Sequence, residues 1–410
     1  MFSIPSLCVV KMSSNASAAP AETSVFSFSL LLCVLLTAAN LRGPITSLGP
    51  VLSQVQHDFV LTPGAAGLLN ALPLLIFGIA SPCAPWLTRR LGLERALAGA
   101  LGIIAAGCLV RSSGLSSGLW LGTLLIGAGI AIANVLVVPL IKRDFAHHSA
   151  LCIGLYAATM ALMAALGSGL AAPLSAITGY TWKAPLGLWA AIALLAVICW
   201  WPHVRTPPVA VSVAAPQRRG SVWRSGIAWQ VAMFMALQTV TFYTLIDWFP
   251  AMAETANIGA TLAGTYLFAY QAIAVVANLA TSMAIKRLRD QRLLGFICSF
   301  SIVIGMVGLL LAPSLSLVWL LFAGVGAGMS MVTCLNLFGL RARDHHQASS
   351  LSAMGQCVGY GLGALGPFLA GWLHGQTASW HAPLVLLVGA ACLQVIFAVL
   401  AGRNRYVSSD

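Results

Sequence analysis

Long apolar runs recur along the whole chain, and they constrain its fold more than any other feature. A helix that crosses a bilayer needs about 20 mostly apolar residues. Twelve runs approach that length: 26–50, 64–87, 96–113, 118–140, 150–172, 184–202, 226–250, 261–285, 294–312, 315–340, 350–373 and 383–402. Because the bilayer core offers no water to unpaired backbone groups, such runs cross it as helices. The sequence therefore predicts an all-α integral membrane protein with twelve transmembrane helices.

The composition argues against a soluble protein and against most partners other than lipid. Only 7% of the residues are charged and 59% are hydrophobic, whereas a soluble domain is about 25% charged. The net charge of +12 would suit nucleic acid, but basic residues in a membrane protein mark cytoplasmic loops. The ten cysteines include no C-x-x-C pair, so we expect no disulfide framework, no metal site and no cofactor.

A polar segment, residues 203–225, divides the predicted spans into six and six. Its Pro, Ser and Arg content is typical of a flexible linker. We therefore expect five regions, namely a leader at 1–25, a first six-helix half at 26–202, the linker at 203–225, a second half at 226–402 and a tail at 403–410. Met12 within the leader is an alternative start of the protein.

The lysine and arginine residues predict the orientation of the helices. If both termini face the cytoplasm, 18 of the 21 basic residues lie in cytoplasmic segments, and only Lys183 falls in an outer loop. Arg42 and Arg111 remain in or at the edge of spans. This bias follows the positive-inside rule, so we expect a bacterial inner-membrane protein with both termini cytoplasmic.

The two halves resemble each other at an offset of 200 residues. Pro50 and Pro250 are expected to close the first span of each half, and Arg143-Asp144 falls on Arg343-Asp344 without a gap. Two halves of equal orientation are parallel repeats, related by an axis along the membrane normal. Such repeats place a substrate site between the halves, and transport follows from rocking one half against the other.

Six-plus-six spans with a basic loop between spans 2 and 3 resemble the major facilitator superfamily. In that loop Arg90 and Gly92 fit the D-R-x-G core of the superfamily, but Arg89 stands where an aspartate is usual. Within the superfamily the chain is similar to the family of cyanate and 2-nitroimidazole transporters. The most specific segments are "NLRGPITSLGPVL" at 40–52, "ALPLLIFGIASPCAPWLTRRLGLERAL" at 71–97, "GAGIAIANVLVVPLIKRDF" at 127–145 and "WQVAMFMALQTVTFYTLIDWFP" at 229–250. The resemblance implies a secondary transporter that works by alternating access.

Arg42 is a permanent charge about four residues from the middle of the first predicted span. An arginine near mid-bilayer costs about 2.5–3.5 kcal/mol on insertion scales. Either the side chain reaches the outer surface, or it faces a central cavity and binds substrate. A guanidinium presents a fixed fork of donors that suits a small planar oxyanion, carboxylate or nitro group.

Other polar residues inside spans are candidates for the same site. Amides and phenols in membrane helices often only bond to neighbouring helices. The candidates lie in segments that resemble the family, on spans that line the cavity in this superfamily: Asn40, Asn134, Tyr156, Gln238, Tyr243 and Gln356.

Asp247 is the acidic residue that the sequence places inside a span, near the outer end of the seventh. It is either a proton-coupling carboxylate or an outer-gate residue. Because Pro250 is expected to end the span, we expect Asp247 to be little buried. A cytoplasmic gate is expected from charged residues of the inner loops: Arg89, Arg90, Glu94, Arg143, Asp144, Asp290 and Asp344.

The sequence thus favours a monomeric carrier of a small polar or anionic solute, with lipids and possible protons as its other partners. It contains no G-x-x-x-x-G-K-[ST] motif, which argues against an ATP-driven pump, and it carries no catalytic motif, so we expect no enzyme. Two alternatives stay open, a multidrug exporter of the same fold and a channel.

Overall fold

The computed structural model describes residues 28–80, 83–145, 148–179, 181–204, 222–285, 288, 290–343 and 345–407. The expected leader, most of the expected linker and residues 408–410 lie outside the described residues. The first half contains α1 (Phe28–Thr46), η1 (Gly49–Val51), α2 (Leu52–Phe59), α3 (Pro63–Ala80), α4 (Ala84–Leu91), α5 (Leu93–Arg111), α6 (Ser116–Asp144), α7 (Ser149–Thr178) and α8 (Lys183–Val204). The second contains η4 (Val222–Arg224), α9 (Gly226–Thr255), α10 (Ala260–Ala284), α11 (Arg292–Leu311), η6 (Pro313–Leu315), α12 (Ser316–Leu340), α13 (His345–Gly363), α14 (Leu365–Thr377) and α15 (His381–Ala401).

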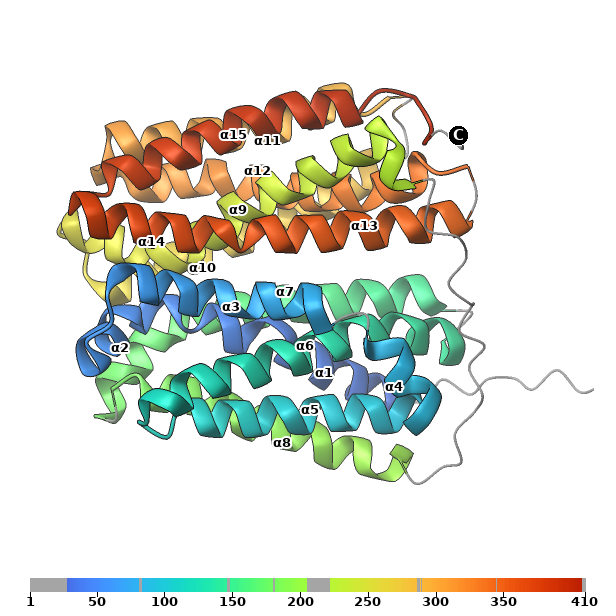
Figure 1. Cartoon of the computed structure of the whole chain (residues 1–410), viewed down its shortest axis with the longest axis horizontal. Coiled ribbons are helices and arrows are strands. Elements are labelled where there is room, and N and C mark those ends of the chain that lie inside the picture. The colour runs from blue at the N-terminus through green and yellow to red at the C-terminus, as the bar shows by residue number, and fades with distance from the viewer. Residues whose placement is uncertain are drawn as a thin grey trace, which may run out of the picture.

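The two halves form two layers of roughly aligned helices, one on the other (Figure 1). Helix α8 ends at Val204, η4 begins at Val222, and the chain returns to Val407 at the same end of the bundle. We call this the linker end and the opposite one the far end. All helices that can cross the bilayer run between these two ends.

Eleven helices among the described residues are long and apolar enough to cross a membrane. The twelfth crossing, expected as one span at 350–373, is divided into α13 and α14 at Ala364. Pro367 explains the break, because it has no N–H to donate to the carbonyl of Gly363, four residues earlier. The all-α fold and the set of spans are otherwise as the apolar runs predict.

The expectation that Pro250 closes its span is wrong, because α9 continues through Pro250 to Thr255. A proline inside a helix frees the carbonyl four residues before it, here that of Ile246. The backbone of Gly49 in η1 packs against that carbonyl, since a Cβ built on Gly49 would lie 2.5 Å from the Ile246 oxygen. Pro50, by contrast, lies in η1, after α1 has ended.

The halves contact each other closely at the far end. A Cβ on Gly67 of α3 would lie 2.6 Å from the carbonyl oxygen of Pro367, at the start of α14. The Gln271 side chain of α10 donates a hydrogen bond of 2.9 Å to the Ser168 hydroxyl of α7. In Figure 1 the ribbons of the two halves converge at the far end and diverge toward the linker end. We call the contacts of Gly49, Gly67, Ser168 and their partners the far-end seam.

The buried side chains follow the same division. One core cluster lies within the first half and includes Leu101, and another lies mainly in the second half and includes Phe234. A third cluster joins Leu48 and Val51 of the first half to Phe249 of the second. Apolar side chains of both halves therefore pack beside the polar contacts of the far-end seam.

Candidate functional site

Arg42 lies between the halves and faces the second half from the first. It is half-buried, and its guanidinium carbon lies 5.6 Å from the ring centre of Phe242 and 5.8 Å from that of Tyr243. Within the described part of the chain its guanidinium makes no hydrogen bond and no ion pair. Its donors are therefore available to a bound solute.

Four tyrosine hydroxyls lie within electrostatic range of the Arg42 guanidinium. They are Tyr156 on α7, Tyr243 on α9, Tyr270 on α10 and Tyr360 on α13. Each of these tyrosines is at most 7% exposed, and they make up four of the seven tyrosines in the chain. Both halves thus contribute phenol groups to one site around a single cation, which we call the Arg42 site.

Two contacts organise the walls of the Arg42 site. The Tyr156 hydroxyl donates a hydrogen bond of 2.7 Å to Oδ1 of Asn134, which fixes α7 against α6. The rings of Phe77 on α3 and Tyr360 on α13 lie 4.5 Å apart, centre to centre, and this pair joins the two halves. The structure therefore brings together Arg42, Tyr243, Tyr156 and Asn134 of the predicted substrate-binding residues.

The three remaining predicted substrate-binding residues make no hydrogen bond with Arg42 among the described residues. Asn40 is fully buried and donates to the Leu36 and Ile192 carbonyls, so its amide faces α8. Gln356 is half-buried and donates to the Ser352 hydroxyl of α13 at 2.9 Å. Gln238 is buried on α9, five residues before Tyr243.

The sequence did not single out Phe242, Tyr270, Tyr360 or Phe77. Tyrosine is a polar residue with few partners in lipid, so its recurrence in the predicted spans is the signal that points to Tyr270 and Tyr360. Which tyrosines converge depends on the rotation of each helix about its axis, and the apolar runs do not determine that rotation.

Asp247 is buried, so the expectation of low burial is wrong. The residue is 2% exposed, and its Oδ2 atom has no hydrogen-bond partner among the described residues. The reason is the continuation of α9 beyond Pro250, which keeps Asp247 under η1. Asp247 lies four residues after Tyr243, one helical turn further toward the far end.

A charged cluster lies at the linker end of the first half. The Arg143 guanidinium donates from Nε to Asp144 Oδ1 at 2.6 Å, from Nη2 to Asp144 Oδ2 at 2.8 Å, and from Nη2 to Glu94. The hydrogen bonds to Asp144, and to a smaller extent the one to Glu94, raise the pKa of Arg143. They fasten the start of α5 to the end of α6.

The remaining predicted gate residues are not part of this cluster. Arg90 stacks over the Trp86 ring at 4.5 Å, and Asp290 lies 3.6 Å from Nε of Arg292. The side chain of Arg89 and the whole of Asp344 lie outside the described residues. Each ion pair formed by described residues stays within one half.

Arg341 is a linker-end residue whose role the sequence did not reveal. It is 2% exposed and donates to the carbonyls of Ala401 and Gly402 at 2.8 and 3.0 Å, and to Oε1 of Gln291 at 2.5 Å. It thus fastens α12 to the end of α15, as Arg143 fastens α5 to α6. The repeat aligns Arg143 with Arg343, which is exposed, so the offset alone points to the wrong arginine.

The arrangement suits binding better than catalysis. Within the described residues no group of three or more His, Cys, Asp or Glu could hold a metal ion. The Arg42 site offers one permanent cation, four phenols and apolar ring faces. A guanidinium of this kind binds planar oxyanions through two parallel hydrogen bonds.

Curated proteins of similar sequence are transporters. The chain is 40% identical to the uncharacterized transporter YycB of Bacillus subtilis (strain 168), over 95% of this chain and 97% of that one. It is 36% identical to the 2-nitroimidazole transporter of Escherichia coli (strain K12), over 92% and 96%. It is 29% identical to the cyanate transport protein CynX of the same organism, over 90% and 97%.

Two solved structures of low sequence identity share the fold of this chain. A bacterial homolog of the human lysosomal transporter Spinster, in an inward-facing and occupied conformation, superposes with a TM-score of 0.76 at 17% identity, over 92% of this chain and 96% of that one. The D-xylose-proton symporter superposes with a TM-score of 0.75 at 16% identity, over 93% and 98%. The family model of the Major Facilitator Superfamily matches residues 30–364. The chain belongs to the Major Facilitator Superfamily, and it is an integral membrane secondary transporter, not an enzyme.

Proposed function

We propose that this transporter carries a small planar anion or nitro compound, bound at Arg42 between the two halves. The observation that carries the proposal is the Arg42 guanidinium, which lies against Phe242 and Tyr243 without a hydrogen bond or ion pair to any described residue. A permanent cation inside a membrane protein marks a substrate or ion pathway. The N–H groups of the Arg42 guanidinium are therefore available to bind the solute.

The groups around Arg42 favour a planar solute. Ring faces of Phe242 and Tyr243 provide apolar walls, and tyrosine hydroxyls can donate to acceptor atoms at the rim of a flat molecule. The groups that act electrostatically on Arg42 are tyrosines, with no carboxylate among them. A site of this charge disfavours the organic cations that a broad multidrug exporter would carry.

The names of the relatives agree with this chemistry. The Escherichia coli relatives are named for 2-nitroimidazole and for cyanate. A nitro group and cyanate each present planar or linear acceptor atoms to a guanidinium. We therefore extend the proposed substrates to nitroimidazole-like, cyanate-like and small carboxylate solutes.

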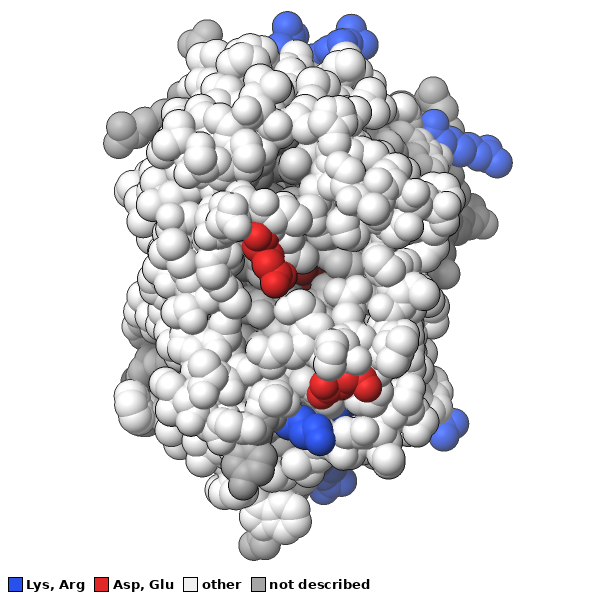
Figure 2. All heavy atoms as spheres, turned by 90° about the vertical axis from the view of Figure 1, so that its left-hand side faces the viewer, with Lys and Arg blue, Asp and Glu red and all other residues white. Residues whose placement is uncertain are grey.

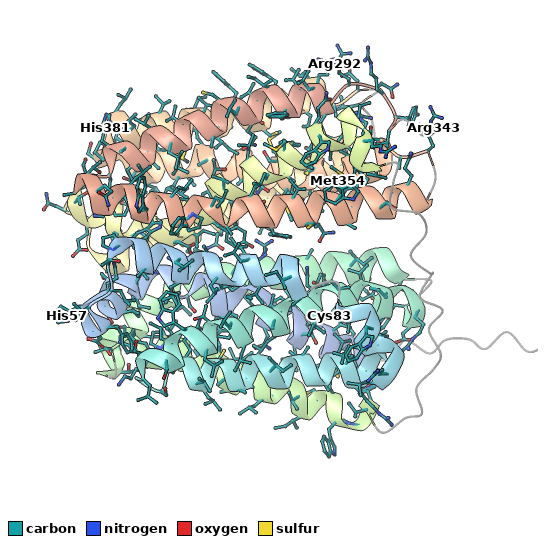
Figure 3. All side chains as sticks on the ribbon, in the orientation of Figure 1. His57, Cys83, Arg292, Arg343, Met354 and His381 are labelled. Atoms are coloured by element: carbon teal, nitrogen blue, oxygen red, sulfur yellow. The ribbon has the colours of Figure 1, made fainter. Side chains whose placement is uncertain are left out.

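We further propose that the linker end is cytoplasmic and that the membrane is the bacterial inner membrane. Figure 3 shows Arg292 and Arg343 at the linker end, and His57 and His381 at the far end. Figure 2 looks onto the far end, where acidic side chains lie near the middle of the face and Lys and Arg lie mainly at its rim. This distribution is that of the positive-inside rule. The sealed far end would then be the outer one.

Counterflow in proteoliposomes tests the proposed function. Vesicles loaded with unlabelled 2-nitroimidazole are expected to accumulate labelled 2-nitroimidazole transiently, and cyanate and benzoate added outside are expected to compete. A carrier shows such counterflow because inward and outward steps share one site, whereas an open pore does not. Absence of counterflow with 2-nitroimidazole, cyanate and benzoate alike would contradict the proposal.

We propose that the linker-end charges act as a gate when the halves approach there. Arg143 of the first half would then meet Asp290 and Asp344 of the second, and Arg89, Arg90, Glu94 and Asp144 would adjust around them. In the present conformation Arg143 is held by Glu94 and Asp144 instead. The exchange of partners between conformations would bias the rocking equilibrium.

Arg143→Gln is expected to lower the stability of the first half by about 1–2 kcal/mol. It removes hydrogen bonds to two carboxylates, each worth about 1.5–3 kcal/mol when buried, and the partial exposure of the pair reduces that value. Thermal unfolding of the detergent-solubilised protein measures the change. Arg343→Gln, at the exposed repeat position, is the control and should leave the Tm unchanged. Equal Tm values for the two variants would contradict the prediction.

A further inference from the structure

We propose that Asp247 is the proton-carrying residue of this transporter, and that its carboxyl group must be neutral before the far end can close. The link to transport rests on the carrier function proposed above. The link to closure of the far end rests on the packing of Asp247 alone.

The far-end seam covers Asp247 from the first half. A Cβ built on Gly49 of η1 would lie 3.1 Å from the Asp247 Cα and 3.3 Å from its carbonyl oxygen. The side chain is 2% exposed, and Oδ2 has no hydrogen-bond partner in the described part of the chain. The closed seam thus excludes both water and protein donors from one carboxyl oxygen.

No charged side chain among the described residues forms an ion pair with Asp247 in this position. Among the side chains that the structure describes, the titratable groups on its own helix and on nearby elements are Glu254 and Tyr243 on α9, Arg224 on η4, Arg42 on α1, His57 and Asp58 on α2, Tyr266 and Tyr270 on α10, Cys334 on α12, Cys357 and Tyr360 on α13, His374 on α14, and His381 and Cys392 on α15. Oδ2 of Asp247 forms no hydrogen bond with any of these groups, and no ion pair among the described residues includes Asp247. A carboxylate buried without a cation or a donor is strongly unfavourable, and such a group takes up a proton instead.

The proton and the solute would use neighbouring positions. Tyr243 contacts Arg42 and lies one turn toward the linker end, on the same face of α9 as Asp247. With the far end open, a proton from water binds one carboxyl oxygen, and the seam can then close. With the linker end open, the proton returns to water past Tyr243. One anion moving with one proton transfers no net charge, so the membrane potential does not oppose entry of the anion.

Distances between spin labels test the proposal without any solute. Labels are attached to cysteines placed at His57 and Gln376, which are exposed at the far end of the first and second halves. The ten native cysteines are replaced by alanine, and size-exclusion chromatography and thermal unfolding show whether that background is still folded. The label-to-label distance is then measured from acidic to alkaline pH.

The parent protein is expected to give a short distance at acidic pH and a longer one at alkaline pH. Asp247→Asn, which is neutral at every pH, should keep the short distance throughout, and Asp247→Glu should restore the pH dependence. His374→Gln is the control for the histidine of α14, the helix that meets Gly67 at the seam, and should behave as the parent. A pH-independent distance in the parent, or a pH-dependent one in Asp247→Asn, would overturn the proposal. Because the readout needs no substrate, failure of 2-nitroimidazole counterflow leaves this test intact.

Discussion

Gly49→Ala is expected to hold the far end of the transporter open and to abolish transport. The new methyl group would lie 2.5 Å from the carbonyl oxygen of Ile246 and 3.1 Å from the Cα of Asp247. Both are backbone atoms of α9, so no side-chain rotation relieves the collision. Overpacking of this kind costs about 1–3 kcal/mol. The closed seam would therefore lose about 5–150-fold in population relative to the open one.

The far-end spin labels at His57 and Gln376 measure this change directly. Gly49→Ala should give the longer distance even at acidic pH, with counterflow of 2-nitroimidazole lost. Gly78→Ala on α3 is the matched control, because a Cβ at Gly78 meets no atom within 4 Å. If Gly49→Ala kept the short distance and normal counterflow, the contact of η1 with α9 would not be part of the seal.

The energetics of the seam explain why it can open at all. Oδ2 of Asp247 is buried at the seam without a hydrogen-bond partner among the described residues. A buried polar group left unpaired costs about 1–3 kcal/mol. Apolar contacts of Leu48, Val51 and Phe249 offset that cost. The unpaired oxygen therefore opposes closure of the seam, and these apolar contacts favour it.

The number and order of the spans could be predicted from the sequence because bilayer thickness sets the length of an apolar helix. The prediction failed where the backbone is irregular. A proline pattern does not say whether a helix ends, as at Pro50, continues, as at Pro250, or breaks and resumes, as before Pro367. Each outcome depends on which neighbour donates to the freed carbonyl oxygen or packs against it.

The sequence predicted only part of the candidate site, because it does not determine how each helix is rotated about its axis. Arg42 stood out because a charge in lipid is costly wherever the helix faces. A tyrosine or an amide carries no such cost, so Tyr270 and Asn40 could not be separated by sequence alone. The structure places the ring of the first 5.9 Å from that of Phe242, which Arg42 faces, and turns the second toward α8. Helix rotation, which is set by packing between spans, decides this difference.

Arg42→Gln is expected to weaken binding of 2-nitroimidazole or cyanate about 10–100-fold while membrane expression stays normal. Hydrogen bonds to a charged donor contribute about 1.5–3 kcal/mol, and each 1.4 kcal/mol is a factor of ten in affinity. Folding should not suffer, because the guanidinium has no partner among the described residues whose loss would leave a buried group unpaired. Arg42→Lys keeps the charge but not the planar fork, so its affinity should lie between that of the parent and that of Arg42→Gln.

Equilibrium binding and counterflow with purified variants measure this effect, with Arg405→Gln at the exposed chain end as the control for charge alone. The alternative is that Arg42 only extends its charge to the membrane surface. In that case Arg42→Lys would reach water as well as arginine does, and all three variants would bind 2-nitroimidazole like the parent. A loss confined to the Arg42 variants, graded from lysine to glutamine, is the outcome that requires a guanidinium fork in contact with the solute. The position of its guanidinium carbon, 5.6 Å from the ring centre of Phe242 and 5.8 Å from that of Tyr243, favours that outcome, because it directs Arg42 across to the second half.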